Sequence, residues 1–565
     1  MKTPNQLQPL LDDLAAIPVV VGVSGHCDLV SEDLAVIRRR VRQELMQLAS
    51  VAKHSPRLLL TALAMGADQL VAQEALALGW SVIAVLPMPL ADFEADFAGP
   101  EELGELRRLL ARCRACYEIP WAARLDPDIT ARRDQQYRDQ GVFVARQSQV
   151  ILALWDGSPR QPGACGTALV VDLCRQGTPS DDGEILSQPE TSGLIHIPVR
   201  RQKDRGHVPH QTLGARTDTS HVVVFTAIDT LNRATQHFYH KQRASIDQSL
   251  DWLLPADKRY ALKRGGTYLA QRYAELDVLS TAYQRRRKQV IQVASGSTIL
   301  AGFTLATYYV FLTLPWFIAY ALAICLAYLL YFLLFRMPLF QIEDHYLEYR
   351  ALTEAIRVQF FWRLSGLTAP VAGHYLQLVQ SNVGWIREAM INLHFASNLL
   401  EPEPVIRFAW VREHWVEDQE AYFLGRESPP KPGKATLRRL TQNRFERAAL
   451  ISFFIGVGLV GLEAGANFMP ALAGFMNTAI SFSASFFLVA AILKGYATTM
   501  GYEEEAASFE QAGGIFRNAR VFLDHTAPAD VTRSRSCVLA LGKYALAENA
   551  QWLLLHRRNA FHIQN

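Results

Sequence analysis

The chain has 565 residues, of which 50% are hydrophobic and 20% are charged, and this length suggests three or four structural units of ~150 residues each. Its 57 basic and 54 acidic residues leave a formal net charge of +3, which argues against a dedicated nucleic-acid-binding protein, because such proteins carry a clear basic excess. Seven cysteines are too few for a disulfide-stabilised scaffold, and the apolar content excludes a disordered chain.

The first 230 residues alternate short β-branched runs with helical stretches. This alternation predicts a parallel sheet with helices on both faces, which makes an α/β Rossmann-like domain. A domain of this kind binds its ligand at the carboxyl ends of the strands. The predicted strands are Pro18–Ser24, Arg57–Ala62, Ser81–Leu86, Gln149–Trp155, Leu194–Val199 and Val222–Phe225, and the predicted helices include Ser31–Ser50, Ala67–Leu78 and Arg132–Arg146.

Glycines and small polar residues gather where these strands end. Glycine lets backbone N–H groups approach a phosphate closely, and the amino end of a following helix adds a favourable dipole. Several such loops on one edge predict a site for a phosphorylated ligand; ordinary turns, which also favour glycine, are the alternative. The candidate ligand-binding residues are Gly22, Ser24, Gly25, His26, Gly66, Ala67, Asp68, Pro87, Asp156, Gly157, Gly163, Gly166 and Thr167.

The same region contains no clear metal site or catalytic constellation. Cys113 and Cys116 have the C-x-x-C spacing of some zinc sites, but no second pair or clustered histidines accompany them, so no metal is expected. The carboxylates Asp68, Asp156 and Asp172 remain available, and they leave an enzymatic role open.

Two long apolar blocks follow. The stretch from Gln289 to Phe335 has no charged residue and is divided near its middle by Pro315, and Ala448–Leu493 contains a single charge, Glu463. About 20 apolar residues in a helix span a hydrocarbon core of ~30 Å. The blocks therefore predict four transmembrane helices in two hairpins, residues 289–336 and 448–493. Buried helices of a soluble core are the alternative.

Basic residues flank both hairpins. Arg285–Lys288 precede the first predicted span and Arg336 follows the second, while Arg444 and Arg447 precede the third and Lys494 follows the fourth. The two hairpin loops contain no Lys or Arg. Because basic residues concentrate on the cytoplasmic side, both termini are expected to be cytoplasmic, in a multi-pass protein of the inner (plasma) membrane.

The sequence thus divides into a Rossmann-like domain and a helical membrane region with cytosolic extensions. The predicted parts are an N-terminal domain (1–230), a helical connector (231–288), the first hairpin (289–336), a cytosolic helical region (337–447), the second hairpin (448–493) and a C-terminal cytosolic helical region (494–565). A connector helix continuous with a span could transmit a displacement, or it could be a passive tether. Small residues in the spans favour close helix packing and a homo-oligomer.

Five motifs of the first domain occur together: Gly22-x-Ser24-Gly25-His26, Gly66-Ala67-Asp68-Gln69-Leu70-Val71, Tyr137-x-x-x-Gly141, Ser148-Gln149-Val150 leading to Trp155-Asp156-Gly157, and Pro162-Gly163-x-x-Gly166-Thr167. Together they resemble the SLOG superfamily, which includes the DNA-processing protein DprA and the LOG phosphoribohydrolases. The resemblance covers roughly residues 15–230 and implies a fold that binds nucleotides or nucleotide-derived messengers, with no further cofactor.

The chain departs from the pattern of this superfamily at three positions. LOG enzymes place a glutamate three residues after the threonine of the phosphate loop, where this chain has Val170. The second glycine of that loop is Ala164, and Cys27 stands where relatives often have arginine. The missing glutamate favours a binding sensor over a LOG-type enzyme.

The helical second half resembles the SLATT-type membrane effectors that accompany SLOG sensors. The two resemblances together imply a membrane-bound sensor–effector that binds a nucleotide-derived signal and perturbs or permeabilises the membrane, in prokaryotic antiphage or conflict defence. The expected partners are the lipid bilayer, a nucleotide-derived small molecule and further copies of the chain, with no nucleic acid. A nucleotide-gated channel or transporter, and a membrane-tethered nucleotide or NAD hydrolase, are the alternatives.

Overall fold

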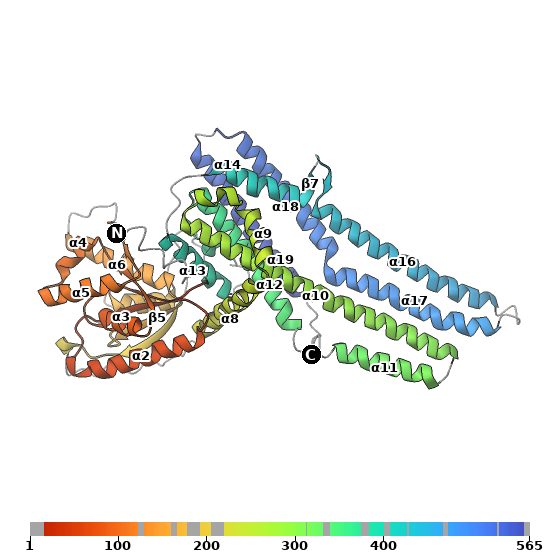
Figure 1. Ribbon diagram of the computed structural model, residues 1–565, viewed down its shortest axis with the longest axis horizontal. Helices are drawn as coiled ribbons and strands as arrows, with labels where there is room; N and C mark the ends of the chain where they lie inside the picture. The colour runs from red at the N-terminus through yellow and green to blue at the C-terminus, as the bar shows by residue number, and fades with distance from the viewer. Residues whose placement is uncertain are drawn as a thin grey trace. The chain divides into compact units, whose positions relative to one another are not determined.

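The computed structural model separates the chain into two units (Figure 1). Unit one comprises Met1–Glu275 and Thr368–Pro404, and unit two comprises Leu276–Leu367 and Val405–Asn565. The described residues are 16–121, 129–159, 166–177, 192–204, 220–311, 314–331, 339–374, 384–400, 407–426, 429–466, 473–527 and 530–558.

Unit one is built on a parallel six-stranded sheet of Rossmann-like topology. Its strand order is β4-β3-β2-β1-β5-β6, and every neighbouring pair is parallel. The predicted α/β class is therefore confirmed for this region. The strands are β1 (Val19–Gly25), β2 (Arg57–Thr61), β3 (Ser81–Leu86), β4 (Ala115–Glu118), β5 (Val150–Trp155) and β6 (Gly193–Pro198).

Helices cover the sheet because its central strands are apolar on both faces. One face packs on α6 and α7, with Val20, Ile83 and Ile151 in a common core with Val170. Helix α3 contacts β1, β2 and β3 and packs against α2 and α5. The helices and 3₁₀ turns of this stretch are η2 (Ser31–Asp33), α2 (Leu34–Val51), α3 (Ala67–Ala77), α4 (Leu90–Phe93), η3 (Glu94–Asp96), α5 (Pro100–Arg112), α6 (Ile129–Gln147), α7 (Thr167–Gln176) and η4 (Gln202–Asp204).

Two sequence predictions about strands differ from the structure. The edge strand β4 was not predicted, because its side chains are mostly exposed and show no apolar run. The predicted strand Val222–Phe225 is wrong: these residues lie in helix α8 (Ser220–Lys241). Phe225, Ile228 and Leu231 are fully buried at a spacing of three, so helical periodicity prevails over the β-branched composition.

A segment from the middle of the chain completes unit one. Helix α13 (Gly384–Leu400) places Phe395 in the same core as the sheet. Asn392 donates a hydrogen bond to the carbonyl of Pro18 (2.7 Å) and accepts one from Gln149 (2.6 Å), and Gln149 in turn accepts from the backbone N–H of Val20. The remaining elements of the unit are α9 (Arg243–Leu253), η5 (Ala256–Ala261), η7 (Val371–His374) and the first part of α10.

The described part of unit two is helical apart from a hairpin of two two-residue strands. It contains α10 (Arg264–Phe311, from Leu276), α11 (Leu314–Tyr331), α12 (Leu339–Leu364), α14 (Phe408–Val411), the π-helical turn η8 (Arg412–Glu417), α15 (Asp418–Leu424), β7 (Gly425–Arg426), β8 (Lys431–Pro432), α16 (Lys434–Ala466), α17 (Ala473–Met500), α18 (Tyr502–Asp524) and α19 (Val531–Arg558).

Three helical stretches of the described residues are long and apolar enough to cross a membrane: Arg264–Thr307, Lys434–Leu462 and Phe482–Asp524. The sequence prediction of four such helices is corrected to three. Among the described residues, the fourth candidate contributes only the shorter apolar helix Phe317–Ala327, which lies within α11 (Leu314–Tyr331).

Candidate functional site

The strand order creates a topological switch point between β1 and β5. The chain proceeds from β1 outward to β2, β3 and β4, then returns to place β5 on the other side of β1, with Gly25 level with Leu154. In open parallel sheets, ligands bind in the crevice outside the carboxyl ends of the strands at such a point. The residues that follow β1 and β5, His26 and Asp156, meet there.

His26 and Asp156 form a mostly buried pair. Nε2 of His26 lies 3.1 Å from Oδ1 of Asp156 and 3.3 Å from the backbone nitrogen of the same residue. Burial and then the charge of Arg201 lower the pKa of His26, and the charge of Asp156 offsets this only in part. Neutral His26 can accept a hydrogen bond from the backbone N–H of Asp156. Protonated His26 can instead donate one to the carboxylate of Asp156. Its ring can thus change partner on protonation.

The carboxylate of Asp156 stays ionised at neutral pH. Burial alone would raise the pKa of Asp156, but hydrogen bonds from Ser158 and the nearby His26 together hold it below the ordinary aspartate value. The backbone N–H of Ser158 donates to Oδ1 at 3.0 Å. Between these residues, Gly157 has a φ of +82°, a backbone conformation that glycine adopts without strain. The turn therefore fixes the carboxylate at the end of β5.

The glycines after β1 and β2 pack two loops against each other. Gly66 has a φ of +76°, and a Cβ there would lie 2.4 Å from the carbonyl oxygen of Cys27. A Cβ on Gly25 would lie 2.3 Å from Cβ of Ala67, whose N–H donates to the carbonyl of His26 at 3.1 Å. This close packing explains both glycines without a ligand, and their predicted role in ligand binding stays a prediction.

Asp68 holds the end of β2 to the start of α3. Its Oδ2 accepts hydrogen bonds from Oγ1 of Thr61 and the N–H of Ala62, each at 3.1 Å. Burial raises the pKa of Asp68 to about 7, although hydrogen bonds from Thr61, Ala62 and Gly25 favour its ionised form. Because these hydrogen bonds join the ends of β1 and β2, the carboxylate of Asp68 has a structural role in the site.

The amino end of α7 supplies a phosphate-friendly backbone beside β1. Gly166 precedes the helix with a φ of +130° and has no atom within 4 Å of the position its Cβ would take. Thr167 is buried, and its Oγ1 lies 3.4 Å from the donating Oγ of Ser24. Unpaired N–H groups at a helix start favour anions. Gly163, the remaining predicted residue of this loop, lies outside the described residues.

Two further predicted positions have packing roles. A Cβ on Gly22 would lie 2.4 Å from Cδ1 of Ile151, so this glycine permits close packing beside β5. The carbonyl of Pro87 accepts a hydrogen bond from Nε2 of Gln136 at 2.8 Å, which fastens the end of β3 to α6. Val170, which stands where LOG enzymes have glutamate, is buried in the sheet core.

Sequence reasoning missed the charged residues that surround the loop after β1. Arg201 donates to Asp28 at 2.9 Å, and Arg200 forms two hydrogen bonds with Asp33 at 2.7 Å each. These pairs fasten the loop to the segment after β6 and bring a guanidinium close enough to influence His26. The partners are more than 160 residues apart, so no local pattern could reveal them.

A second polar group lies on α6. Tyr137 donates a hydrogen bond to Asp96, and Arg133 forms an ion pair with the same carboxylate. Burial and the neighbouring Asp96 raise the pKa of Tyr137, so its hydroxyl stays protonated. Tyr137 belonged to a sequence motif, whereas Asp96 and Arg133 were not singled out.

The groups at the switch point suit an anion. His26, Arg201 and the start of α7 offer a ring nitrogen, a guanidinium and backbone N–H groups, all of which can donate to phosphate oxygens. In the part of the chain that the structure describes, no three His, Cys, Asp or Glu side chains gather as a metal ion would require.

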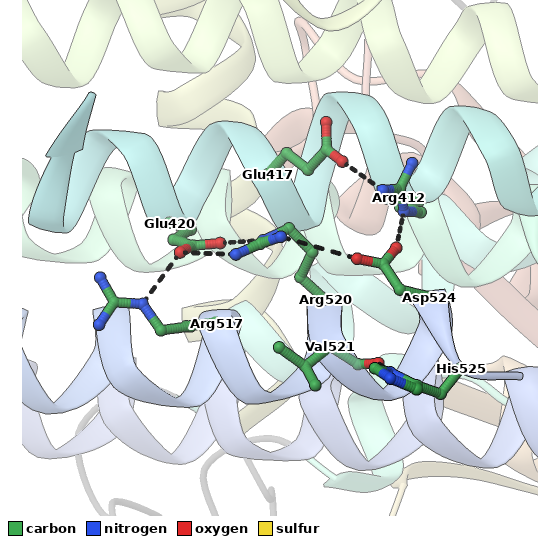
Figure 2. Close-up of polar contacts among 8 residues, drawn as sticks. All are labelled: Arg412, Glu417, Glu420, Arg517, Arg520, Val521, Asp524 and His525. Atoms are coloured by element: carbon green, nitrogen blue, oxygen red, sulfur yellow. Dashed lines mark hydrogen bonds and ion pairs between the residues drawn. The ribbon is translucent and has the colours of Figure 1, made fainter. Parts of the chain in front are cut away.

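Unit two contains a separate network of ion pairs between α15, η8 and α18 (Figure 2). Glu420 accepts from Arg517 at 3.1 Å and from Arg520 at 2.6 Å. The network continues from Arg520 to Asp524 and from Asp524 to Arg412. Burial would raise the pKa of Glu420, but the two arginines outweigh it and lower the pKa. These ion pairs attach α18, which follows α17, to η8 and α15.

Comparison with known proteins gives no family assignment. No protein-family model matches the chain. No curated protein matches it either.

Proposed function

We propose that the chain is a membrane-bound sensor–effector whose Rossmann-like unit binds a nucleotide-derived signal and whose apolar helices then perturb or permeabilise the membrane. The resemblance of its motifs to SLOG sensors and of its helical half to SLATT-type effectors suggests a role in prokaryotic antiphage or conflict defence. Both termini would lie in the cytoplasm, with the shorter apolar helix α11 making the return crossing between α10 and α16.

One observation carries this proposal: His26, Arg201 and the start of α7 are held around the switch point between β1 and β5. This is the ligand position of open α/β sheets, and its donors match phosphate oxygens. The guanidinium of Arg201 is close enough to His26 to lower the pKa of its ring. A phosphate bound at this position would place its negative charge beside both groups.

The continuity of α10 supports coupling between binding and the membrane. The helix runs over 48 residues from Arg264 to Phe311, begins in unit one, continues in unit two from Leu276 and contains the first membrane-crossing candidate. A change at its first turns can therefore be passed on through unbroken backbone hydrogen bonds. Such two-state helix displacements are an established form of switching.

The burial of Val170 supports binding rather than hydrolysis of the LOG type. That side chain lies in the core beneath the sheet, so no carboxylate projects from this position. Asp156 is ionised and paired with His26, which is the one arrangement in the site that would favour a hydrolase instead.

Calorimetry of the full-length chain in detergent tests the proposal. We expect one or more members of a panel of cyclic dinucleotides, cyclic trinucleotides, ADP-ribose, cyclic ADP-ribose, AMP and NAD to bind. Replacing Arg201 with glutamine should weaken that binding at least about tenfold, because a charge-assisted hydrogen bond contributes roughly 1.5–3 kcal/mol. Arg107→Gln, which removes an exposed arginine paired with Glu94 elsewhere in unit one, is the matched control.

The outcomes separate the three functional hypotheses. Absence of binding across the panel contradicts the sensor. Release of nicotinamide or ribose from the bound compound indicates the hydrolase. Growth arrest on producing the ligand in cells supports a membrane-damaging effector, whereas selective conductance without arrest supports a gated channel. Cysteine labelling that places the termini on opposite sides of the membrane contradicts the proposed topology.

A further inference from the structure

The apolar helices of unit two carry their basic residues at one end only. Residues 289–335 and 448–493 contain no Lys or Arg. Six exposed basic side chains lie just outside these stretches, and we call them the basic belt: Arg285, Arg286 and Lys288 on α10, Arg444 and Arg447 on α16, and Lys494 on α17.

An aromatic cluster holds the three helices at a common level beside the belt. Phe445 of α16 packs on Tyr496 of α17, with ring centroids 5.0 Å apart, and on Tyr502 of α18 at 6.0 Å. Ile291 of α10 belongs to the same buried cluster. Each residue of the belt lies within six positions of a cluster residue on its own helix, so a rise of 1.5 Å per residue places all six within about 12 Å along the helix axes.

The belt has a surplus of positive charge. Among the described residues, no carboxylate forms an ion pair with any of its six members, and Arg286 instead lies 5.9 Å over the ring of Tyr283. Four carboxylates near this level oppose it: Glu446, which accepts from Gln442, Glu503 and Glu504 in the first turn of α18, and the exposed Asp344 of α12, whose neighbour His345 packs on Tyr283. Glu505 is already paired with Arg438. Among the described residues, the six cations therefore outnumber these four carboxylates.

We infer that the basic belt binds the head groups of anionic phospholipids at the cytoplasmic surface of the bilayer. Long Lys and Arg side chains can extend from a helix toward the head groups, and tyrosines favour the same interfacial depth. The three helices present these cations together at the edge of their charge-free segments, so several head-group phosphates can be bound at once. The inference rests on the membrane-crossing part of the proposed function and is independent of the nucleotide.

Lipid retention measures this property. The full-length chain is mixed in dodecyl maltoside with equal amounts of phosphatidylglycerol and phosphatidylcholine and is then passed through gel filtration. We expect phosphatidylglycerol to be retained preferentially, and rising salt to remove the preference, because each basic residue near an anionic surface contributes about fivefold to binding. The sixfold variant R285Q/R286Q/K288Q/R444Q/R447Q/K494Q should lose at least about tenfold of the preference.

The control is a variant that loses three exposed arginines of unit one, R39Q/R175Q/R243Q, and it should keep the preference. Equal retention of the two lipids by the unaltered chain, or an equal loss in the control, overturns the inference. Displacement by millimolar inorganic phosphate also overturns it, because the belt would then be a site for a free anion. A chain that fails to fractionate with membranes refutes the membrane part of the proposed function, whereas an embedded chain without lipid preference refutes only the belt. The salt series on the unaltered chain decides the matter if the sixfold variant does not fold.

Discussion

The sheet of unit one and the helices α16 and α17 of unit two have opposite distributions of polar and apolar side chains. In unit one, Val19, Val20 and Val21 of the central strand are 0% exposed. In unit two, Phe454 of α16 is 65% exposed, while Ser452 is buried and donates to the carbonyl of Phe486 on α17 at 2.8 Å. Water favours the first arrangement and hydrocarbon favours the second, in which serines join helices and large apolar side chains face outward. This contrast is the one expected if the sheet folds in water and the apolar parts of α16 and α17 lie in hydrocarbon.

Charges placed on the outward face of α16 should have the largest effect. L450K/F454K would put two ammonium groups at positions that are 56% and 65% exposed. Each costs roughly 3 kcal/mol in hydrocarbon, so we expect most of the chain to leave the membrane fraction. V36K/V223K, at two valines of unit one that are each 64% exposed, should have no effect on fractionation. A double variant of α16 that remains in the membrane would contradict the contrast between the units.

The buried carboxylate of Asp68 should make unit one sensitive to pH. Its folded pKa of about 7 lies above the ordinary value of 3.8, so the folded state holds the proton more tightly and loses stability as pH rises from about 4 to about 7. In Asp68→Asn this loss should be absent, a difference on the order of 4 kcal/mol between the two ends of the range. Thermal unfolding followed at pH 4 and pH 8 measures it.

Asp68→Ala provides the comparison at the same position. It removes the acceptor for Thr61 and Ala62 and should destabilise the unit at both pH values. Parallel pH profiles for the unaltered chain and Asp68→Asn would show that Asp68 is not the titrating group.

Gly66→Ala should destabilise unit one by roughly 3 kcal/mol, because it combines a positive φ with a Cβ 2.4 Å from a backbone oxygen. Gly104→Ala is the matched control: this glycine lies within α5 with no atom within 4 Å of the added Cβ, and the change should stabilise the helix by about 1 kcal/mol. Urea unfolding of the two variants measures both effects. Equal midpoints would refute the proposed packing of the loops.

The ion-pair network of unit two should contribute least. Arg520 is about one-third exposed, so solvent screens its pairing with Glu420. A double-mutant cycle of Glu420→Gln and Arg520→Gln should give a coupling free energy of about 1 kcal/mol that falls in high salt. A coupling that is unchanged in 1 M salt would contradict this interpretation.

The sequence predicted what local patterns encode. Continuous apolar runs located five of the six strands of the sheet, and strand-end glycines located His26 and Asp156 before their proximity was known. The edge strand β4 was not predicted because its exposed side chains form no apolar run. The role of Arg201 and the packing of α13 on the sheet were not predicted, because both depend on contacts between distant parts of the chain.

The interrupted course of unit one has a consequence for its biosynthesis. Asn392 and Phe395 leave the ribosome only after residues 289–335 have been made. Until then, Gln149 lacks its amide partner and the sheet lacks part of its apolar cover. A truncated gene product ending at residue 275 would have the same deficiency, whereas one in which residues 275 and 368 are joined by a short linker would not. The nascent sheet domain therefore completes its folding only once the first apolar segment is available to the translocation machinery.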